Sequence, residues 1–523
     1  MKKFEILDCT FRDGGYYTNW NFAQNLAEEY FRTVAKLPIS IVELGYLSNS
    51  NDLNGPFYHM NKNLLSKAKE ILRKNQKIYG MVNFKEIKKI KDLDILLKEN
   101  IKFLDGIRLA VSPYKLDTLI KIINPLVKKY KKISFNVNLM YLSKWKDDEI
   151  LLKKTISKLS HKVNTVSFVD SYGALLPSEV DSFFKKLKNF TTNFKIGCHF
   201  HNNCGLALAN TLQAQELGCD VVDSTFKGMG RGAGNAETEL LLAINADKSN
   251  SIYGFELSNL LEKFESMKKN LKWGSSFVYA YAANSGFSQS EIMDLMQKRR
   301  LDPGTALKAI HNKKKEDKNF LFNNLKALSI LRSSRHPNPI LVGGSPSLTE
   351  YGENLFKNLS PKTPIILSGS RALFNFYNLQ IKIKNPLILV LSGSEIKKIN
   401  TPKNKKIFNQ LNIFGLLAEK DFLPKNLNFK KSKITTLEAV GLNPLLIVGL
   451  TLLKLKVKKM FVAFFEGNPH EERGLVVMEE TDESVKILKQ KGLKIFSITK
   501  SFLNVKRINP WINDKLFYSN KKK

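Results

Sequence analysis

Two histidines one residue apart, His199 and His201, stand in an otherwise apolar run of the sequence. On a β-strand such an i, i+2 pair points both imidazoles to one face. Asp13, with Arg12 beside it, follows the first apolar run of the chain, and Asn235 closes a glycine-rich stretch. Two imidazoles, one carboxylate and one amide oxygen form a mixed ligand set suited to Mn²⁺, Co²⁺, Zn²⁺ or Mg²⁺. So few ligands leave positions open for a bidentate substrate, and Arg12 is placed to stabilise an enolate oxygen.

Each of these motifs also has a structural interpretation. A lone His-Phe-His is more often a pair of core histidines than a pair of ligands, and a glycine-rich loop can be a tight turn or a phosphate cradle. No Lys-Ser or Lys-Thr follows the glycines, which excludes a P-loop. Because the histidines occur together with the Arg-Asp-Gly motif and the asparagine loop, we favour the metal site.

The fold must bring these distant side chains together. The first 245 residues alternate short apolar runs with longer amphipathic ones, which predicts strands and helices in turn. The predicted strands cover 4–8, 41–46, 78–83, 103–110, 133–140, 165–170, 195–201 and 221–225. Eight such units match a (β/α)₈ TIM barrel, with a doubly wound open sheet as the rival. In a closed barrel the eighth strand pairs with both the seventh and the first, so the four candidate ligands would converge at the carboxyl ends of these consecutive strands.

The rest of the chain divides into two parts. Residues 255–330 read as helical, and Ser288 with Glu291 has the pattern of a capping box. A stretch rich in serine and proline then interrupts every pattern, and strand–helix alternation restarts after it. We therefore expect a barrel over 1–250, a helical extension over 251–332, and a second α/β domain with a Rossmann-like open sheet, of unknown role, over 333–523.

Composition limits the classes of protein. The 523 residues are 43% hydrophobic, which excludes disorder as the main state, and 83 Lys+Arg against 48 Asp+Glu give a net charge of +35. No long basic arm or stacking aromatic run appears, so we expect anionic small molecules and no specific nucleic-acid partner. Four cysteines without a CxxC pair, and no apolar leader, predict a soluble cytoplasmic protein without a membrane partner. We also expect a homo-oligomer.

Three motifs together carry a family resemblance. They are Leu7-Asp8-Cys9-Thr10-Phe11-Arg12-Asp13-Gly14, His199-Phe200-His201-Asn202 and Gly228-Met229-Gly230-Arg231-Gly232-Ala233-Gly234-Asn235. Over about residues 1–310 the sequence resembles the metal-dependent aldolase and Claisen-condensing lyase superfamily. It is most similar to the 4-hydroxy-2-oxovalerate aldolase branch, through the Gly-Ala-Gly-Asn form of the last motif and the stretch 273–279. The resemblance implies a divalent-metal lyase, with Mn²⁺ the first choice. Such a lyase cleaves a 4-hydroxy-2-oxo acid or adds pyruvate enolate to an aldehyde.

The resemblance also assigns roles to residues. It makes Asp13, His199 and His201 metal ligands, gives Asn235 a binding or supporting role at the metal, and makes Arg12 the enolate-stabilising group. It places Asp170, with Ser171 next to it, at a position of the sixth strand that lines the substrate pocket. Glu43, at the end of the second strand, and Arg108, at the end of the fourth, are weaker candidates for the pocket, with a structural role as the alternative.

The sequence departs from this branch at one position. The branch has a proton-transfer histidine three residues after the metal-binding aspartate, where this chain has Tyr16. An unperturbed tyrosine is a poorer base at neutral pH. Tyr279, with Tyr281 as the alternative, matches the tyrosine that the branch contributes from its helical extension. We therefore expect the substrate or the proton path to differ from that of the catabolic aldolase.

Two other functions stay open. One is an acyl-CoA-dependent condensing synthase of the isopropylmalate synthase type. The other is a barrel scaffold whose second domain binds a nucleotide or sugar phosphate. The turns at 343–348 and 367–371 follow strands and could bind a phosphate. Residues 337–523 contain no cysteine, which excludes a fused thioester-forming dehydrogenase.

Overall fold

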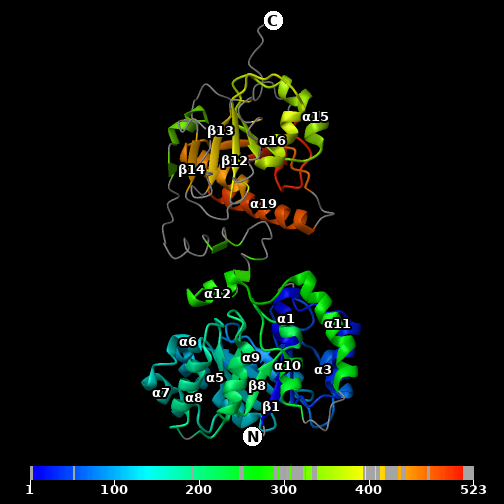
Figure 1. Cartoon of the computed structure of the whole chain (residues 1–523), viewed down its shortest axis with the longest axis vertical. Coiled ribbons are helices and arrows are strands. Elements are labelled where there is room, and N and C mark those ends of the chain that lie inside the picture. The colour runs from blue at the N-terminus through cyan, green and yellow to red at the C-terminus, as the bar shows by residue number, and fades with distance from the viewer. Residues whose placement is uncertain are drawn as a thin grey trace. The chain divides into compact units, whose positions relative to one another are not determined.

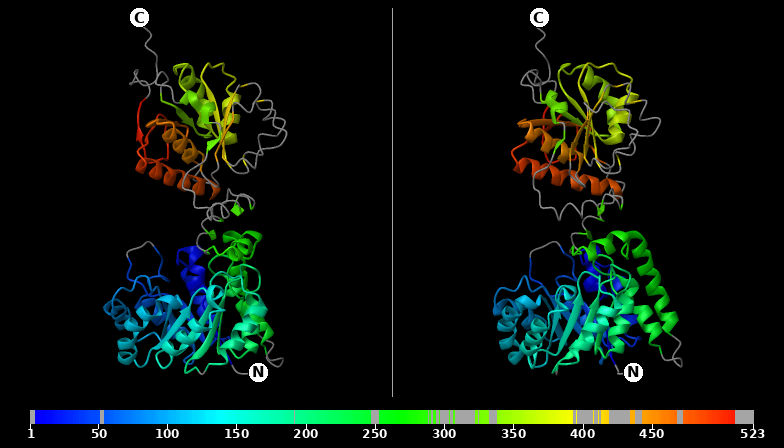
Figure 2. Two further views of the ribbon diagram at one scale, coloured as in Figure 1. Left: turned by 90° about the vertical axis from the view of Figure 1, so that its left-hand side faces the viewer. Right: turned by 60° about the vertical axis from the view of Figure 1, so that its left-hand side comes forward.

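The structure is a computed structural model that describes residues 4–50, 54–190, 192–246, 253–287, 338–392, 443–467 and 472–509, with shorter pieces between 289 and 331 and between 395 and 437. The chain divides into two compact units, Met1–Met293 and Asp294–Lys523, and each is described by itself (Figures 1 and 2). The domain boundaries expected at 250 and 332 stay predictions.

The first unit is a closed barrel of eight parallel strands in the order β1 to β8. The strands are β1 (Glu5–Asp8), β2 (Ile41–Tyr46), β3 (Lys77–Val82), β4 (Gly106–Val111), β5 (Ser134–Leu139), β6 (Thr165–Asp170), β7 (Lys195–Phe200) and β8 (Val221–Ser224). The barrel closes where β1 pairs with β8, from Glu5 opposite Val221 to Asp8 opposite Ser224. The predicted TIM barrel is confirmed, and the open sheet is excluded for this unit.

Helices follow the strands around the barrel. They are α1 (Thr10–Thr18), α2 (Gln24–Val34), α3 (Lys62–Ile71), α4 (Ile90–Asn100), α5 (Leu116–Lys129), α6 (Leu142–Trp145), α7 (Glu149–Leu159), α8 (Pro177–Leu187), α9 (Ala207–Glu216) and α10 (Thr238–Ile244), with 3₁₀ turns η1 (Pro113–Lys115) and η2 (Phe226–Gly228). In α5 the buried positions Leu119, Ile120, Ile123 and Leu126 recur every three or four residues, which places one apolar face toward the barrel.

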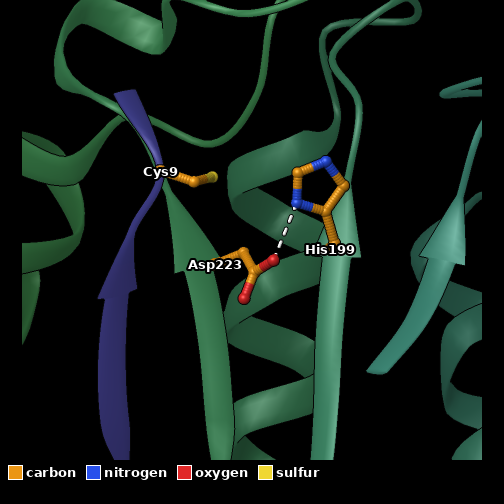
Figure 3. Close-up of side chains that lie close together, drawn as sticks. All are labelled: Cys9, His199 and Asp223. Carbon is orange, nitrogen blue, oxygen red and sulfur yellow. Dashed lines mark hydrogen bonds and ion pairs between the residues drawn. The ribbon is translucent and has the colours of Figure 1, made fainter. Parts of the chain in front are cut away.

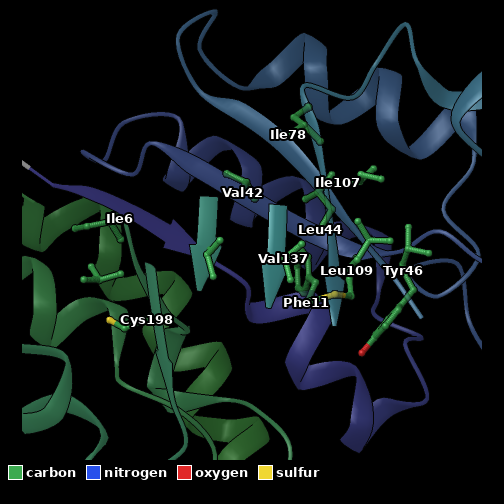
Figure 4. Close-up of a cluster of buried hydrophobic side chains, with 14 of the residues drawn as sticks. Ile6, Phe11, Val42, Leu44, Tyr46, Ile78, Ile107, Leu109, Val137 and Cys198 are labelled. Carbon is green, nitrogen blue, oxygen red and sulfur yellow. The ribbon is translucent and has the colours of Figure 1, made fainter. Parts of the chain in front are cut away.

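Strands β1 to β5 each contribute apolar side chains to the barrel core. Ile6, Val42, Ile78, Ile107 and Val137 belong to one buried cluster contributed by five successive strands (Figure 4). Because parallel strands of a barrel are covered on both faces, they read in the sequence as near-continuous hydrophobic runs. Within the strands, the charged residues Glu43, Arg108 and Asp223 belong to the site described below, whereas Glu5, Lys77 and Lys195 stand at the first positions of their strands.

Two helices extend the barrel unit, α11 (Tyr253–Leu271) and α12 (Phe277–Asn284). Between them, the buried ring of Trp273 donates from Nε1 to the carbonyl of Lys227, 2.9 Å away, in the glycine-rich stretch after β8. Lys263 of α11 forms an ion pair with Glu29 of α2. The extension is therefore fixed to the loop that carries Asn235.

The second unit contains one sheet in the order β17-β16-β15-β10-β11-β12-β13-β14-β9, parallel except for the β14–β9 pair. Its strands are β9 (Phe322–Asn323), β10 (Ile340–Val342), β11 (Ile365–Ser368), β12 (Leu387–Leu391), β13 (Phe414–Ala418), β14 (Ile434–Leu437), β15 (Lys459–Ala463), β16 (Lys494–Ser497) and β17 (Lys506–Arg507). The predicted second α/β domain with an open sheet is confirmed. Sequence patterns missed β9, β14 and β17, of which β9 and β17 have only two residues each.

Helices cover both faces of this sheet. They are α15 (Ser347–Lys357), α16 (Gly369–Asn378), α18 (Pro444–Lys454) and α19 (Glu472–Gln490), with a 3₁₀ segment η3 (Leu325–Leu331). Ile340 and Val342 of β10 belong to one hydrophobic cluster with residues of α15 and α16, and the intervening Leu341 belongs to a second cluster with residues of α18 and α19. Successive side chains of a strand point to opposite faces, so the two clusters are the two covered faces of the sheet.

No helix in the described ranges is long and apolar enough to cross a membrane.

Candidate active site

Three ligand-type side chains meet at the carboxyl ends of the barrel strands. Asp13 lies in α1, directly after β1, His199 lies in β7, and His201 follows that strand. One ligand atom from each of the three lies within 4.8 Å of the other two, and all three side chains are buried. This is the cluster that the sequence predicts.

His199 is oriented by Asp223 of β8. Its Nδ1 lies 2.9 Å from Asp223 Oδ2 (Figure 3). Its Nε2 lies 3.7 Å from Asp13 Oδ2. Burial raises the pKa of the Asp223 carboxyl, but the Arg108 guanidinium and His199 together hold it below its usual value. An ionised carboxylate only accepts, so Nδ1 carries the proton and the Nε2 lone pair faces Asp13.

His201 and Asn235 complete the donor set. Nδ1 of His201 lies 3.3 Å from the carbonyl oxygen of Gly234, which leaves Nε2 for a ligand. Burial lowers the pKa of the His201 imidazole well below its ordinary value, so this ring is neutral. Asn235 donates from Nδ2 to Asp13 Oδ2 at 2.6 Å, while its Oδ1 is buried without a hydrogen-bond partner among the described residues.

These donors fit a divalent metal ion. Two imidazole nitrogens, a carboxylate and an orphaned amide oxygen face one another in a buried site, which is the chemistry of a site for Mn²⁺, Zn²⁺ or a similar ion. Burial raises the pKa of the Asp13 carboxyl, yet the Arg12 guanidinium, together with the hydrogen bond from Asn235, lowers it, so Asp13 is ionised. A second cluster, Cys9 with His199 and Asp223, uses the opposite side of the same imidazole.

Arg12 is held by two carboxylates. Its Nε donates to Glu43 Oε1 at 2.5 Å, and its Nη1 pairs with Asp13. Glu43 also accepts from Arg108 Nη1 at 3.3 Å, and Arg108 Nη2 donates to Asp223 Oδ2 at 2.6 Å. Glu43 and Arg108 are almost completely buried and contact these charged partners. The structure thus places both in an ionic network that supports Arg12 and His199.

A cavity of about 790 Å³ opens over this cluster. Among its lining residues are Arg12, Asp13, Tyr16, His199 and His201. Its walls carry further aromatic and cationic side chains, among them Trp20, Tyr46, Tyr58, Tyr141, Lys85, Lys115 and Arg231. Asp13, the two histidines and Arg12 therefore face a space large enough for a small organic acid, whereas Asn235 is not among the lining residues.

The two candidate proton-transfer tyrosines lie in different surroundings. The Tyr16 hydroxyl is 3.2 Å from that of Tyr46, and both residues line the cavity. Tyr279 is not among the lining residues; its hydroxyl is 3.5 Å from that of Tyr17, which donates to the Gly232 carbonyl at 2.6 Å. Burial raises the pKa of both the Tyr17 and the Tyr279 hydroxyl. Tyr281, the alternative, is 38% exposed.

Asp170 and Ser171 do not line the cavity. The Asp170 carboxylate accepts from the backbone N–H groups of Gly173 at 3.1 Å and Leu175 at 2.9 Å. Burial raises the pKa of this carboxyl to about 6, although these backbone hydrogen bonds oppose the shift. Ser171 Oγ accepts from the backbone N–H of Tyr141 at 2.8 Å. Both side chains shape the loop after β6, and their role toward substrate stays a prediction.

The sequence analysis assigned no role to two residues of the site, Asp223 and Arg231. A signal for Asp223 was present, because a lone carboxylate in an apolar strand needs a buried partner. Its pairing with His199 depends on the neighbouring positions of β7 and β8, which the sequence does not show. Arg231 was visible as the one charged residue of the glycine-rich stretch.

The glycine–serine turns of the second unit are already occupied by acidic side chains. Ser347 Oγ donates to Glu466 Oε1 at 2.5 Å, and Ser370 Oγ donates to Glu395 Oε2 at 2.7 Å. A carboxylate at each turn opposes the binding of an anion there. The phosphate-binding prediction for this unit gains no support from these contacts.

Eight parallel strands closed into a barrel, with a carboxylate and two imidazoles at their carboxyl ends, define a TIM barrel with a candidate metal site at the end where enzymes of this fold hold their active sites.

Comparison with known proteins gives the family. Residues 112–263 match the HMGL-like family model. An oxaloacetate decarboxylase of Mycobacterium tuberculosis is 27% identical over 241 residues, which are 46% of this chain and 68% of that protein. A 4-hydroxy-2-oxovalerate aldolase of Carboxydothermus hydrogenoformans is 29% identical over 252 residues, 47% of this chain and 71% of that one. The crystal structure of the N-terminal domain of a candidate aldolase from Bacteroides vulgatus superposes with a TM-score of 0.52 at 33% identity, covering 56% of this chain and 97% of that domain.

The barrel part of the chain belongs to the HMGL-like family of metal-dependent TIM-barrel enzymes, which act on carbon–carbon bonds. The expected superfamily and the expected enzyme class are confirmed. The alternative of a barrel that serves only as a scaffold is set aside.

Proposed function

We propose that the barrel is a divalent-metal-dependent aldolase that cleaves a 4-hydroxy-2-oxo acid, or in reverse adds the enolate of pyruvate to an aldehyde. The observation that carries this proposal is the meeting of Asp13, His199 and His201 with Arg12 at one cavity. Both named relatives support it, since loss of CO₂ from oxaloacetate and cleavage of 4-hydroxy-2-oxovalerate each leave the enolate of pyruvate.

Asp13, His199 and His201 would hold the metal, with the Asn235 amide oxygen as a fourth donor. When bound, a divalent ion supplies Lewis-acid polarisation of the 2-oxo group. Arg12 directs a fixed positive charge toward the enolate oxygen, because Glu43 and Asp13 hold its Nε and Nη1 and prevent it from reorienting. Preorganised charge of this kind stabilises the developing anion without a further cost of reorganisation.

Tyr16 is the proposed group that moves the proton of the substrate hydroxyl. Its hydroxyl lies in the cavity wall beside that of Tyr46, whereas Tyr279 is removed from the lining and hydrogen-bonded to Tyr17. In the cleavage direction the C4 hydroxyl must lose its proton as the C3–C4 bond breaks, which needs a group at the cavity wall and within reach of that oxygen.

The test is exchange of the pyruvate methyl protons. Protein with Mn²⁺ and pyruvate in D₂O should lose the methyl signal in the NMR spectrum, and His199→Ala should abolish the exchange. His161→Asn changes an exposed histidine on the barrel surface and serves as the matched control. Absence of exchange in the wild type, or exchange that survives in His199→Ala, would overturn the proposal.

A second assay separates the condensing-synthase alternative. Incubation with a 2-oxo acid and acetyl-CoA releases free CoA only in a synthase of the isopropylmalate type. We expect no CoA release, and the appearance of aldehyde plus pyruvate from a 4-hydroxy-2-oxo acid.

A further inference from the structure

The glycine-rich stretch after β8 directs an arginine into the cavity. Arg231 lines the cavity, and its guanidinium carbon lies 5.3 Å from the centre of the Tyr16 ring. Its Nε is buried without a hydrogen-bond partner, and no carboxylate of the described residues forms an ion pair with it. Burial of a guanidinium N–H without an acceptor costs free energy. The placement of Arg231 at the cavity therefore indicates that a bound ligand supplies the acceptor.

Its neighbours hold this arginine in place. A Cβ on Gly230 would lie 2.2 Å from Asn235 Nδ2, and Gly232 has a φ of +70° with Gln289 against it. The backbone on either side of Arg231 is therefore fixed close to the candidate ligands and cannot accept ordinary side chains. The side chain starts from a rigid loop, which is the condition for selective recognition.

The charge of the cavity wall indicates what the ligand carries. Among the described residues, four cationic side chains line it, Arg12, Lys85, Lys115 and Arg231, against one carboxylate, Asp13. Arg12 is already paired with Asp13 and with Glu43 below the cavity. The carboxylate of a 2-oxo acid would be bound beside Asp13 and Arg12, so the positive charge of Arg231 is left for another group.

We propose that Arg231 binds a second anionic group of the substrate, a carboxylate or phosphate on the aldehyde-derived half, and so selects anionic aldehydes. This inference rests on the proposed aldolase function. It places the anion on the aldehyde half because Arg231 stacks over Tyr16, the residue proposed to handle the hydroxyl that becomes the aldehyde oxygen.

The first experiment uses metal-free protein and does not depend on catalysis. In the presence of EDTA, malonate and inorganic phosphate are titrated calorimetrically into the wild type, Arg231→Gln, Arg231→Lys and the control Arg32→Gln, which changes an exposed arginine of α2. We expect Arg231→Gln to weaken binding of one of the two anions about ten- to a hundredfold, Arg231→Lys to restore part of it, and the control to match the wild type. Equal binding by wild type and Arg231→Gln would overturn the inference.

The second experiment compares aldehydes in the presence of Mn²⁺ and pyruvate. Succinic semialdehyde is paired with butyraldehyde for a carboxylate, and glyceraldehyde 3-phosphate with glyceraldehyde for a phosphate. In the wild type one anionic aldehyde should have at least a tenfold lower KM than its neutral partner, and Arg231→Gln should remove that difference. A wild type without preference in either pair would contradict the inference.

Methyl exchange of pyruvate separates the two proposals. If Arg231 acts on the aldehyde half, Arg231→Gln raises the KM of the anionic aldehyde at least tenfold more than the pyruvate KM measured by methyl exchange. A larger rise in the pyruvate KM than in the aldehyde KM would assign the arginine to the pyruvate carboxylate and overturn the inference while leaving the aldolase intact. Absence of exchange in the wild type would overturn the aldolase, and the metal-free titration would still decide whether Arg231 binds anions.

Discussion

At the scale of single residues, the site is held by a chain of alternating charges. His199 donates to Asp223, Asp223 and Glu43 both accept from Arg108, and Glu43 accepts from Arg12, which pairs with the candidate ligand carboxylate. All members are almost completely buried. In such surroundings removal of one partner leaves the next charge uncompensated, so each substitution affects the site beyond the residue that is changed.

Asp223→Asn tests this chain at its link to the imidazole. The amide can still accept from His199 Nδ1, but it loses the charge that pairs with Arg108 and that makes the imidazole a stronger ligand. We expect Mn²⁺ affinity to fall about ten- to a hundredfold, measured by calorimetric titration. Asp181→Asn, a surface carboxylate of α8 that pairs with Lys185, should leave the affinity unchanged. Wild-type affinity in a folded Asp223→Asn protein would contradict the positioning role.

Sequence patterns identify the candidate metal ligands and miss the residues that position them. Asp13, His199 and Asn235 stand in motifs of distinctive composition, so they could be predicted. Asp223 is one acidic residue in an apolar strand, and its role arises from the side-by-side placement of β7 and β8. Asp170 was predicted to line the substrate pocket, but its carboxylate accepts hydrogen bonds from backbone N–H groups of its own loop.

Glu239 of α10 predicts a pH dependence of stability. Burial raises the pKa of its carboxyl to about 7 from 4.5; the Lys227 backbone N–H donates to it at 3.0 Å, while the Lys227 ammonium is 3.9 Å away. A pKa that is higher in the folded state makes a contribution to stability that is complete below about pH 4.5 and lost as the pH rises through 7.

Glu239→Gln removes this titration. Relative to the variant, the wild type should lose on the order of 3 kcal/mol of barrel stability between pH 5 and pH 8, measured by urea unfolding followed through tryptophan fluorescence. The exposed Glu149→Gln should parallel the wild type at both pH values. A difference between wild type and Glu239→Gln that does not change with pH would show that the carboxyl titrates normally.

At the scale of elements, the eight barrel strands were predictable to within about three residues, and α1 was not. The sequence after β1 contains Gly14 and Gly15, which have low helix propensity, yet Thr10–Thr18 is helical. A Cβ on Gly15 would lie 2.0 Å from the Trp20 ring, and one on Gly14 would lie 2.7 Å from Met229 Sδ. The glycines serve close packing against residues that the sequence alone does not place, and this packing overrides their low helix propensity.

The close packing of glycines in the loop after β8 predicts that a larger residue there weakens metal binding. In Gly230→Ala the new methyl group would lie 2.2 Å from Asn235 Nδ2 and 2.9 Å from Asp13 Oδ2, so the loop must move away from the ligands. We expect at least a tenfold loss of Mn²⁺ affinity in a barrel whose circular dichroism is unchanged. Gly218→Ala is the control: its φ of +92° makes the change strained, but no atom lies within 4 Å. It should lower stability by about 1 kcal/mol and leave Mn²⁺ affinity unchanged.

At the scale of the whole molecule, the net charge of +35 is reflected in the cationic side chains that line the barrel cavity. In the part of the chain that the structure describes, four cations and one carboxylate line that cavity, which suits an anionic substrate. The acidic partners at the turns of the second unit show that the excess does not extend to every candidate site. The net charge of the chain thus says something about the substrate class only at the barrel cavity, where several cationic side chains lie together.

The division of the chain into two units predicts where it can be cut. Residues 1–293 contain the closed barrel with its own core, and they include contacts that hold the glycine-rich stretch after β8. Trp273 donates to the Lys227 carbonyl at 2.9 Å, and the Gly232 N–H donates to Met293 Sδ at 2.9 Å. A cut at 250 removes both contacts, whereas a cut at 293 keeps them.

We therefore expect residues 1–293 to fold alone, with the Mn²⁺ affinity of the full chain, and residues 1–250 to bind Mn²⁺ at least tenfold more weakly and to unfold at a lower temperature. Calorimetric titration and thermal unfolding of the two truncated proteins measure both quantities. The 1–250 protein loses the extension that fixes the loop bearing Asn235, so its defect should be larger at the metal site than in the helix content of the barrel. Equal metal affinity in the two proteins would show that the loop holds its ligands without the extension, and an unfolded 1–293 protein would show that the barrel depends on the second unit.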